Sequence, residues 1–276
     1  MTDFDRKYAD CLKQILEHGI EEVNERTGHR VKALPGLHFN VENGFPLLTL
    51  RKITPRVFAA EQVWFMLGSR KPVEFIDQYT KIWNDFTNIN GVVNSAYGFR
   101  WRYYFGRDQI GMLVKLLEKE PSSRQGVVIT WDAAEDGLNP DLRKKNVPCP
   151  ISFTVNIIGG KLHFHTIFRS NDMVVGCPFD VAGFALLQRI LAARLGVGVG
   201  VYSHSISNAH IYDVHYEAAA ELVRRSGQDT EIELTAQPGW FDRASSGDVT
   251  LVDEIVSTLE AQYSPAAPIK GLPVVL

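Results

Sequence analysis

The chain has little cysteine, no excess of basic residues and no long apolar run. Its three cysteines, an odd number and far apart, do not suit a disulfide framework, so we expect a protein of a reducing compartment. With 29 Lys and Arg against 32 Asp and Glu, the net charge of −3 provides no general field for polyanions. Composition therefore does not suggest binding to a nucleic-acid polymer, although a local basic pocket could hold one phosphate.

Membrane and targeting signals are also missing. No apolar run approaches the length that spans a bilayer, and residues 1–5 are acidic, without the hydrophobic block of a signal peptide. We therefore expect a cytoplasmic protein. Internal repeats, low-complexity tracts and long linkers are absent, and 276 residues with 45% hydrophobic content are enough for one substantial core. The sequence predicts a single domain over residues 1–276.

Two kinds of hydrophobic periodicity are present, which predicts an α+β fold. Helical spacing covers residues 4–20, 57–67, 110–117, 179–195 and 214–225. Alternating or continuous apolar runs predict strands over 37–41, 126–131, 151–157, 162–168 and 201–212, and the run at 126–131 is expected to be buried. Gly159-Gly160 is typical of a two-residue hairpin turn. The charge-rich residues 21–32 are interpreted as a solvated loop.

Residues 168–180 hold a high density of polar groups between two apolar runs. The stretch combines a cation, a hydroxyl, an amide and carboxylates, namely Arg169, Ser170, Asn171, Asp172 and Asp180. A strand of a globular protein has no structural need for so many polar groups in one place. A site for a small, phosphate-bearing, hydrogen-bonding ligand does need them, and the sequence therefore predicts such a site here.

Cys149 has a proline on each side, which restricts the backbone at the start of a predicted strand. A lone cysteine is by default a small core hydrophobe. A nucleophilic thiolate needs a nearby cation, and pairing across the Gly159-Gly160 turn brings Arg169 back toward residues 150–152. Both interpretations stay open on the residues alone.

Other candidate groups have simpler interpretations. His163 and His165 share one strand face, but no Cys or His at a supporting spacing completes a metal site, so we expect no metal and two solvent-facing histidines. Residues 196–200 are glycine-rich, yet they follow a helix and lack the GxGxxG pattern of a dinucleotide-binding loop. Glu61 is either a charge on a helix face or a buried group with a task, and the sequence favours the first.

Many short stretches, each weak alone, occur in a joint order and spacing that is highly specific. They are Arg26–Gly28, Phe45–Thr49, Trp64–Gly68, Ile82–Trp83, Tyr97–Gly98, Ser123–Arg124, Pro148–Cys149, Arg169–Asp172, Gly176–Asp180 and His210–Tyr212. Through them the chain resembles the thymidylate synthases and the related pyrimidine-nucleotide C5 hydroxymethylases over almost its whole length. The resemblance implies a mostly antiparallel, twisted sheet flanked by helices, a homodimer formed through the sheet, and 5,10-methylenetetrahydrofolate as co-substrate.

The resemblance also implies catalytic roles. Cys149 matches the thiolate that adds to C6 of the pyrimidine, which makes C5 a nucleophile toward the one-carbon unit. Glu61 matches a carboxylate that organises water and proton transfer, and Tyr97 matches a group that assists proton removal from C5. Asp180 stands where thymidylate synthases have the asparagine that recognises uracil.

Binding roles follow from the same resemblance. The residues that match phosphate binders are Arg26, Arg169, Ser170 and, reaching across the homodimer, Arg124. The residues that match groups holding the sugar 3'-hydroxyl are His210 and Tyr212. The residues on the folate side are Ile82, Trp83, Asp172, Gly176 and Phe179. The apolar C-terminus resembles a tail that closes over bound folate.

Three residues depart from the thymidylate synthase pattern. Gln125 replaces the second arginine of a tandem pair, and Pro150 replaces a histidine after the nucleophile. Asp180 changes base recognition, because uracil has an O4 acceptor and an N3–H donor, whereas cytosine has a 4-amino donor and an N3 acceptor. A carboxylic acid accepts from the amino group and donates its proton to N3, and the amide is mismatched. The alternative is that Asp180 caps the following helix.

We therefore expect a C5 hydroxymethyltransferase acting on a cytidine monophosphate, dCMP or CMP, with dCMP favoured. The alternatives are a thymidylate synthase acting on dUMP, a C5-methylase of dCMP and, outside enzymology, a nucleotide-binding regulator that kept the pocket. A regulator would not need this set of groups together, namely Cys149, Arg169, Glu61 and Tyr97, so their joint presence argues against it. The sugar preference, the product and the pathway stay open.

Overall fold

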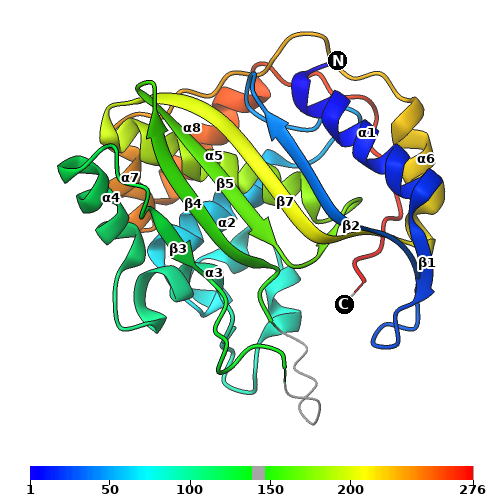
Figure 1. Cartoon of the computed structure of the whole chain (residues 1–276), viewed down its shortest axis with the longest axis horizontal. Helices are drawn as coiled ribbons and strands as arrows, with labels where there is room; N and C mark the ends of the chain where they lie inside the picture. The colour runs from blue at the N-terminus through cyan, green and yellow to red at the C-terminus, as the bar shows by residue number, and fades with distance from the viewer. Residues whose placement is uncertain (139–146, 276) are drawn as a thin grey trace.

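The computed structural model describes residues 1–138 and 147–275 (Figure 1). One twisted sheet dominates the described residues, with strand order β1-β2-β7-β5-β4-β3 and the short β6 paired to β7. All pairings are antiparallel except those of β7 with β5 and with β6. The strands are β1 Ile20–Val23, β2 Arg30–Val41, β3 Val127–Ile129, β4 Pro150–Ile158, β5 Lys161–Phe168, β6 Asn171–Asp172 and β7 Gly198–Tyr212. The predicted α+β fold is confirmed.

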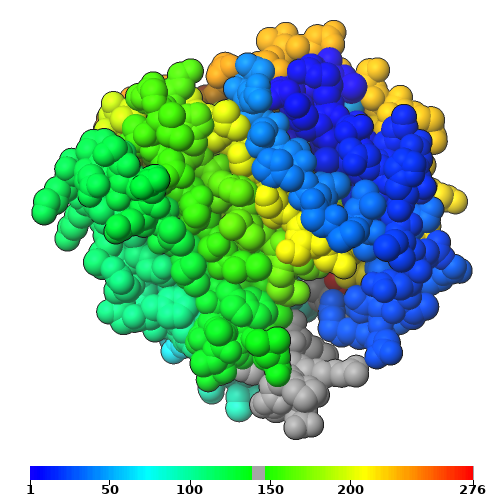
Figure 2. Space-filling view, in the orientation of Figure 1, coloured from blue at the N-terminus to red at the C-terminus, as the bar shows by residue number. Residues whose placement is uncertain are grey.

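Helices cover one face of the sheet and flank both of its edges. They are α1 Asp3–His18, α2 Pro55–Leu67, α3 Tyr97–Phe99, α4 Gln109–Lys119, α5 Cys177–Leu195, α6 Tyr216–Arg224, α7 Trp240–Ser245 and α8 Val249–Glu260. In Figure 1, α2, α5 and α8 lie behind the sheet, while the described chain places no helix over the near face of β4, β5 and β7. Figure 2 shows these strands reaching the molecular surface on that face. Among the described helices, none is long and apolar enough to cross a membrane.

The central helix α5 forms the middle of the core. Its side chains are hydrophobic around most of the circumference, and thirteen of its residues are buried, as the sequence predicted. The helix begins at Cys177-Pro178, two residues before the predicted start, because proline fits the first turn where no backbone donor is needed. It ends at Gly196, which adopts a left-handed conformation with φ of 65°. This position places the N-terminal end of α5 directly after the polar stretch 168–180.

The hairpin between β4 and β5 positions the predicted nucleophile. Gly159 and Gly160 both have positive φ, 59° and 73°, as a two-residue turn of this type requires. The register runs to Pro150 opposite Phe168, and the Arg169 amide donates to the Cys149 carbonyl at 2.9 Å. The predicted approach of Arg169 to the start of β4 is confirmed.

Two segments differ from the sequence prediction. Residues 21–32, expected as a solvated loop, contain β1 and the start of β2. Their high charge is compatible with a strand because β1 lies at the sheet edge and all its side chains are exposed. Residues 126–131, expected as a buried strand, form only β3, in which Val127 and Ile129 are 47% and 38% exposed. The apolar run gave a wrong prediction of burial because β3 is the strand at the opposite edge of the sheet and directs only Val128 to the core.

His163 and His165 also differ from expectation, since both are half-buried. Nδ1 of His163 accepts from the Val201 amide at 3.2 Å, and Nε2 of His165 lies 2.8 Å from Ser205 Oγ. The two histidines therefore bond to the neighbouring strand β7. Within residues 1–138 and 147–275, no cluster of His, Cys, Asp and Glu is arranged to hold a metal ion.

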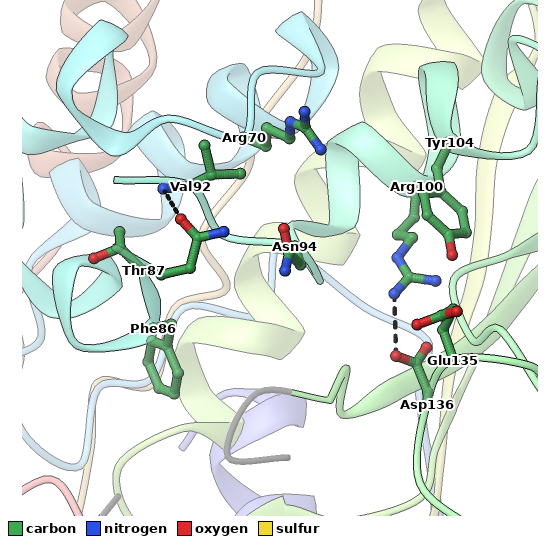
Figure 3. Close-up of a pocket in the computed structure, with 10 residues that line it drawn as sticks. Arg70, Phe86, Thr87, Val92, Asn94, Arg100, Tyr104, Glu135 and Asp136 are labelled. Atoms are coloured by element: carbon green, nitrogen blue, oxygen red, sulfur yellow. Dashed lines mark hydrogen bonds and ion pairs between the residues drawn. The ribbon is translucent and has the colours of Figure 1, made fainter. Parts of the chain in front are cut away.

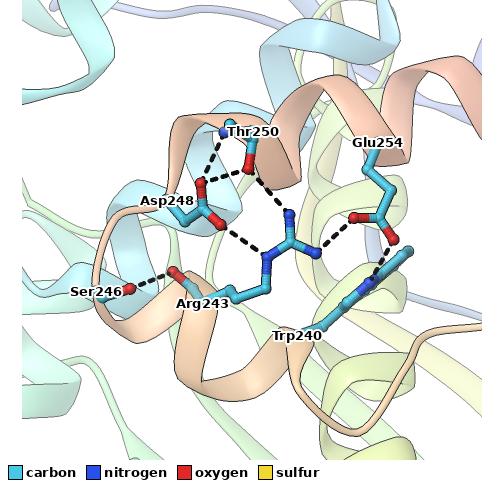
Figure 4. A network of polar contacts seen from close by, with 6 residues as sticks. All are labelled: Trp240, Arg243, Ser246, Asp248, Thr250 and Glu254. Carbon is cyan, nitrogen blue, oxygen red and sulfur yellow. Dashed lines mark hydrogen bonds and ion pairs between the residues drawn. The ribbon is translucent and has the colours of Figure 1, made fainter.

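A polar network joins α7 and α8 (Figure 4). The Arg243 guanidinium donates to Asp248 at 2.7 Å and to Glu254 at 2.5 Å, and Trp240 Nε1 donates to the same glutamate at 3.0 Å. Asp248 also caps α8 by accepting from the Thr250 amide. The network fixes α7 against α8, and both helices pack on α2, which carries Glu61.

Candidate active site

A cavity of 510 Å³ lies where the ends of β2 and β7 meet the turn before α5. Seven of the residues predicted from the sequence line it together: Arg26, Cys149, Arg169, Ser170, Asp172, His210 and Tyr212. A smaller cavity of 60 Å³ is lined by five more: Glu61, Trp83, Tyr97, Phe179 and Asp180. Segments far apart in the sequence therefore bring one set of predicted side chains to one region.

Cys149 lines the larger cavity, is partly accessible, and hydrogen-bonds with Tyr97 of the smaller cavity. Burial raises the pKa of its thiol, the Arg169 charge lowers that pKa, the Asp180 charge raises it, and a hydrogen bond with Tyr97 lowers it. Arg169 is fixed beside the cysteine because its Nε donates to the Pro148 carbonyl at 2.8 Å. Cys149 packs against the core and also forms part of the wall of a polar cavity with an arginine beside it, which are surroundings that suit a nucleophile.

The polar end of the larger cavity carries two guanidinium groups and two hydrogen-bonding rings. Arg26 comes from the turn before β2, and it lies close enough to Tyr212 to hydrogen-bond its hydroxyl. Burial lowers the pKa of His210, whose Nδ1 lies 3.5 Å from Ser170 Oγ. A neutral histidine and a tyrosine can each accept or donate a hydrogen bond, which suits hydroxyl groups, whereas paired guanidinium groups suit an anion such as phosphate.

Glu61 lies in the smaller cavity and is not the solvated helix-face charge that the sequence favoured. Its Oε1 accepts from Trp83 Nε1 at 2.7 Å. Burial raises the pKa of Glu61 to about 7, a change that the Trp83 hydrogen bond opposes and the Asp180 charge reinforces. Burial likewise raises the pKa of Tyr97. The helical periodicity of α2 did not identify this cavity because its wall comes from other parts of the chain.

Asp180 lies in the first turn of α5 and does not cap it. The N-cap is Gly176, whose carbonyl accepts from the Asp180 amide at 3.0 Å. The Asp180 side chain instead accepts from Asn171 Nδ2 at 2.8 Å. Burial raises the pKa of Asp180 to about 7. The alternative interpretation of this aspartate as a helix cap is therefore wrong.

The thymidylate synthase family model matches residues 6–263 of this chain. The chain belongs to the thymidylate synthase family. Members of the family transfer a one-carbon unit to C5 of a pyrimidine nucleotide and use methylenetetrahydrofolate as co-substrate. The membership agrees with the cysteine, the arginines and the hydrogen-bonding residues that the two cavities bring together.

The residues that the resemblance puts on the folate side of this thymidylate synthase family member are not all in one place. Trp83 and Phe179 line the smaller cavity, and Asp172 lines the larger one. Asp172 also holds the turn before α5, because its Oδ1 accepts from the Val174 amide at 2.9 Å. Among the described residues, Ile82 and Gly176 line neither of these two cavities.

Arg124 lies in the turn between α4 and β3, and among the residues described it lines neither cavity of its own chain. The prediction places this arginine in the site of a partner subunit. That placement stays a prediction, as does the homodimer itself. The C-terminal tail does approach the site: Val275 lines the larger cavity, and the Pro273 carbonyl lies 2.9 Å from His215 Nε2.

Sequence reasoning missed two buried residues behind Asp180. Asn171 belongs to the same polar stretch, but its amide had no assigned role. His204 lies on β7, where Tyr202, His204 and Ile206 form the buried phase of the alternation. A histidine in the core-facing phase of a strand was the available signal.

A third cavity, of 490 Å³, opens on the other side of Phe86 (Figure 3). Arg100 projects from the short helix after α3, and its guanidinium donates to Asp136 at 3.0 Å while lying over the Tyr104 ring. Arg70 lies at the opposite wall. None of the residues predicted from the sequence lines this cavity.

Proposed function

We propose that this thymidylate synthase family member is a C5 hydroxymethyltransferase of a cytidine monophosphate, with dCMP the preferred substrate. The proposal depends on one observation: at the position that matches base recognition, Asp180 has a pKa that burial raises to about 7, and one of its oxygens accepts from Asn171 Nδ2. Near neutral pH such a carboxyl is available in its acid form. The acid can donate a proton to N3 of cytosine and accept a hydrogen bond from the 4-amino group.

The same proton supports the chemistry. Sharing it with N3 draws electrons out of the ring and favours addition of the Cys149 sulfur to C6. The new S–C6 bond leaves C5 as a carbon nucleophile, and methylenetetrahydrofolate supplies the one-carbon unit. Tyr97 and Glu61 border the same small cavity as Asp180 and would accept or deliver protons during the later steps.

The described residues fit both substrates. Arg26, Arg169 and Ser170 would bind the nucleotide phosphate, and His210 and Tyr212 would bind the sugar hydroxyl. Aromatic surface from Trp83 and Phe179 suits a flat pterin ring, and the apolar tail ending near Val275 suits a cover over it.

A homodimer formed through the sheet is part of the proposal. Each subunit would lend Arg124 to the phosphate site of the other. On β2 and β7, the side chains outside the buried phase of the alternation include polar groups, with Asn40 accepting from Ser203 and His38 bonded to Ser205. Hydrogen-bonding side chains in these positions can pair with a second copy of the same face about a two-fold axis.

Three alternatives are separated by experiment. Two are thymidylate synthase activity on dUMP and methylation of dCMP, because Trp83 and the tail fit a hydride-returning folate as well as a hydroxymethyl product. The third is a nucleotide-binding regulator without turnover. The arrangement of Cys149, Arg169 and Tyr97 favours an enzyme, because a regulator needs no nucleophile beside a cation.

One assay tests the proposal. The protein is incubated with methylenetetrahydrofolate and, in separate reactions, with dCMP, CMP and dUMP, and the products are identified by mass. We expect 5-hydroxymethyl-dCMP as the main product. Turnover of dUMP alone would contradict the assignment from Asp180, and dihydrofolate formation would identify a methylase. Binding of nucleotide without any product would identify the regulator.

A further inference from the structure

A buried chain of polar groups leads from Asp180 into the protein interior. Asn171 Nδ2 donates to Asp180 Oδ2 at 2.8 Å, and Asn171 Oδ1 lies 3.1 Å from His204 Nε2. On its other side, His204 Nδ1 lies 2.7 Å from Thr166 Oγ1 and 3.0 Å from the Tyr202 hydroxyl. The four residues behind Asp180 are each at most 3% exposed. Such a chain is costly to bury unless every group in it is paired.

The hydrogen bonds set the direction of each donor in the chain. Burial lowers the pKa of His204 to about 3, so the ring is neutral and has one donor and one acceptor nitrogen. With Nδ1 accepting from the Thr166 or Tyr202 hydroxyl, Nε2–H donates to Asn171 Oδ1. The asparagine amide then presents its NH₂ group to Asp180. In this orientation the amide can donate to Asp180 whether its carboxyl group is ionised or protonated. In the reverse orientation the amide oxygen would face Asp180 and could pair only with the protonated acid.

The orientation matters because a free carboxylic acid fits both bases. With the proton on the oxygen facing N3, the acid matches cytosine. With the proton on the oxygen facing position 4, it donates to O4 and accepts from N3–H, and it matches uracil. A free asparagine amide has the same ambiguity, since rotation about its last side-chain bond exchanges the positions of its oxygen and its NH₂ group. Asp180 by itself therefore does not decide between the two bases, and a neighbour must distinguish its two oxygens.

We propose that Asn171, held by His204, makes Asp180 select cytosine by fixing which of its oxygens carries the proton. Donation from Asn171 keeps Oδ2 an acceptor, and its second lone pair is then available to the 4-amino group. The proton of the acid is confined to Oδ1, which faces N3. Asn171 and His204 act through Asp180 and are positioning residues. This inference rests on the proposed cytidine monophosphate activity and explains its selectivity.

The first test is Asn171→Leu, which removes the donor and keeps the side-chain shape. We expect the ratio of kcat/KM for dCMP to kcat/KM for dUMP to fall about tenfold or more, because Asp180 can then carry its proton on either oxygen. The variant leaves the His204 donor buried and unpaired, so Asn171→Leu combined with His204→Phe removes both polar groups together. An unchanged ratio in either folded variant would overturn the inference.

A second test separates positioning from simple loss of stability. His204→Gln keeps a side-chain donor toward Asn171, and His204→Phe does not, so selectivity should be largely retained in the first and lost in the second. Gln188→Leu is the matched control: Gln188 is equally buried and donates to the Leu162 carbonyl at 2.9 Å, away from Asp180. Its selectivity ratio should equal that of the wild type. Equal selectivity in both His204 variants would contradict the proposal.

The pH dependence of kcat/KM for dCMP is a further measurement, because a loss of stability alone would not shift it. The Asn171 hydrogen bond lowers the pKa of Asp180, so its removal should raise that pKa further. The acid form then persists to higher pH, and the alkaline limb of kcat/KM for dCMP in Asn171→Leu should move upward. A limb at the wild-type position would contradict the inference.

Failure of the proposed function gives a different result. If the wild-type protein converts neither dCMP nor CMP, the function is wrong whatever the variants do. If the wild type selects dCMP and Asn171→Leu selects it equally, the function stands and the positioning role is wrong. A wild type that converts dCMP and dUMP equally well also overturns the positioning role.

Discussion

At the scale of single residues, the two carboxyl groups of the small cavity differ from ordinary surface acids. Burial raises the pKa of both Glu61 and Asp180 to about 7. The Asp180 charge contributes to the raised pKa of Glu61, so ionisation of one group disfavours ionisation of the other. Near neutral pH the pair therefore holds protons that a surface pair would have lost, which is what proton transfer to a base requires.

The pH dependence follows from the sign of these shifts. A carboxyl whose pKa is raised to about 7 stays protonated below that pH and loses its proton above it. We therefore expect kcat/KM for dCMP to fall as pH rises through about 7, and we expect Asp180→Asn to lack this limb. Steady-state kinetics from pH 5.5 to 9 would measure it (roughly the range in which the group titrates). A limb that persists in Asp180→Asn would assign the titration to another group.

Asp180→Asn should also change the base preference. The amide cannot transfer a proton to N3, so dCMP turnover should fall by about a hundredfold or more. The ratio of dUMP to dCMP turnover should rise, and rise further when Asn171→Leu frees the amide to turn its NH₂ group toward O4. Competition assays with both nucleotides would measure the ratio. An unchanged preference would show that the base is recognised elsewhere.

Cys149→Ala should separate binding from chemistry. Without the sulfur no bond to C6 forms, and turnover should fall by roughly 10⁴-fold or more. Binding of dCMP, measured by calorimetry, should remain within about threefold of wild type because the phosphate and sugar contacts are untouched. Turnover at the wild-type rate in this variant would exclude the covalent mechanism.

At the scale of elements, close packing of α3 on α2 positions Tyr97. A Cβ added at Gly98 would lie 2.0 Å from the Phe65 carbonyl oxygen, which no relaxation of a side chain can relieve. Gly98→Ala should therefore lower the free energy of unfolding by about 1–3 kcal/mol and displace Tyr97 from the cavity. Urea unfolding and turnover measurements would test both effects.

Gly239→Ala is a suitable control for this substitution. Its added Cβ would meet no atom within 4 Å, and Gly239 has an ordinary φ of −71° at the start of α7. The change should cost under about 1 kcal/mol, mainly through the helix cap, and leave turnover unchanged. Similar losses in both variants would show that the contact between α3 and α2 is not the cause.

At the scale of the whole molecule, the proposed dimer predicts complementation between subunits. Arg124→Ala should weaken phosphate binding, and Cys149→Ala should remove the nucleophile. A mixed dimer of the two variants contains one site with both groups intact, so mixing after dissociation should restore about a quarter of wild-type activity. Sedimentation equilibrium would confirm the dimer first. No recovery in verified mixed dimers would place Arg124 outside the partner's site.

The hydrophobic pattern of the sequence predicted most of the helices and strands. The long helix α5, the β4–β5 hairpin and the alternation of β7 are all visible as hydrophobic periods, because burial imposes the same period on the side chains. The edge strands were predicted poorly. Exposed charges hid β1, and an apolar run overstated β3, because edge strands have no partner on one side and lose the contrast between buried and exposed positions.

The sequence by itself predicted Cys149 and Asp180 as reactive groups and indicated the family to which the chain belongs. Tertiary structure alone decided their state. Burial raised the carboxyl pKa values, the hairpin brought Arg169 to the thiol, and the fold excluded the helix-cap role of Asp180. It also placed Asn171 and His204 behind that aspartate. A residue type fixes which hydrogen bonds are possible, whereas only packed neighbours fix which one is made.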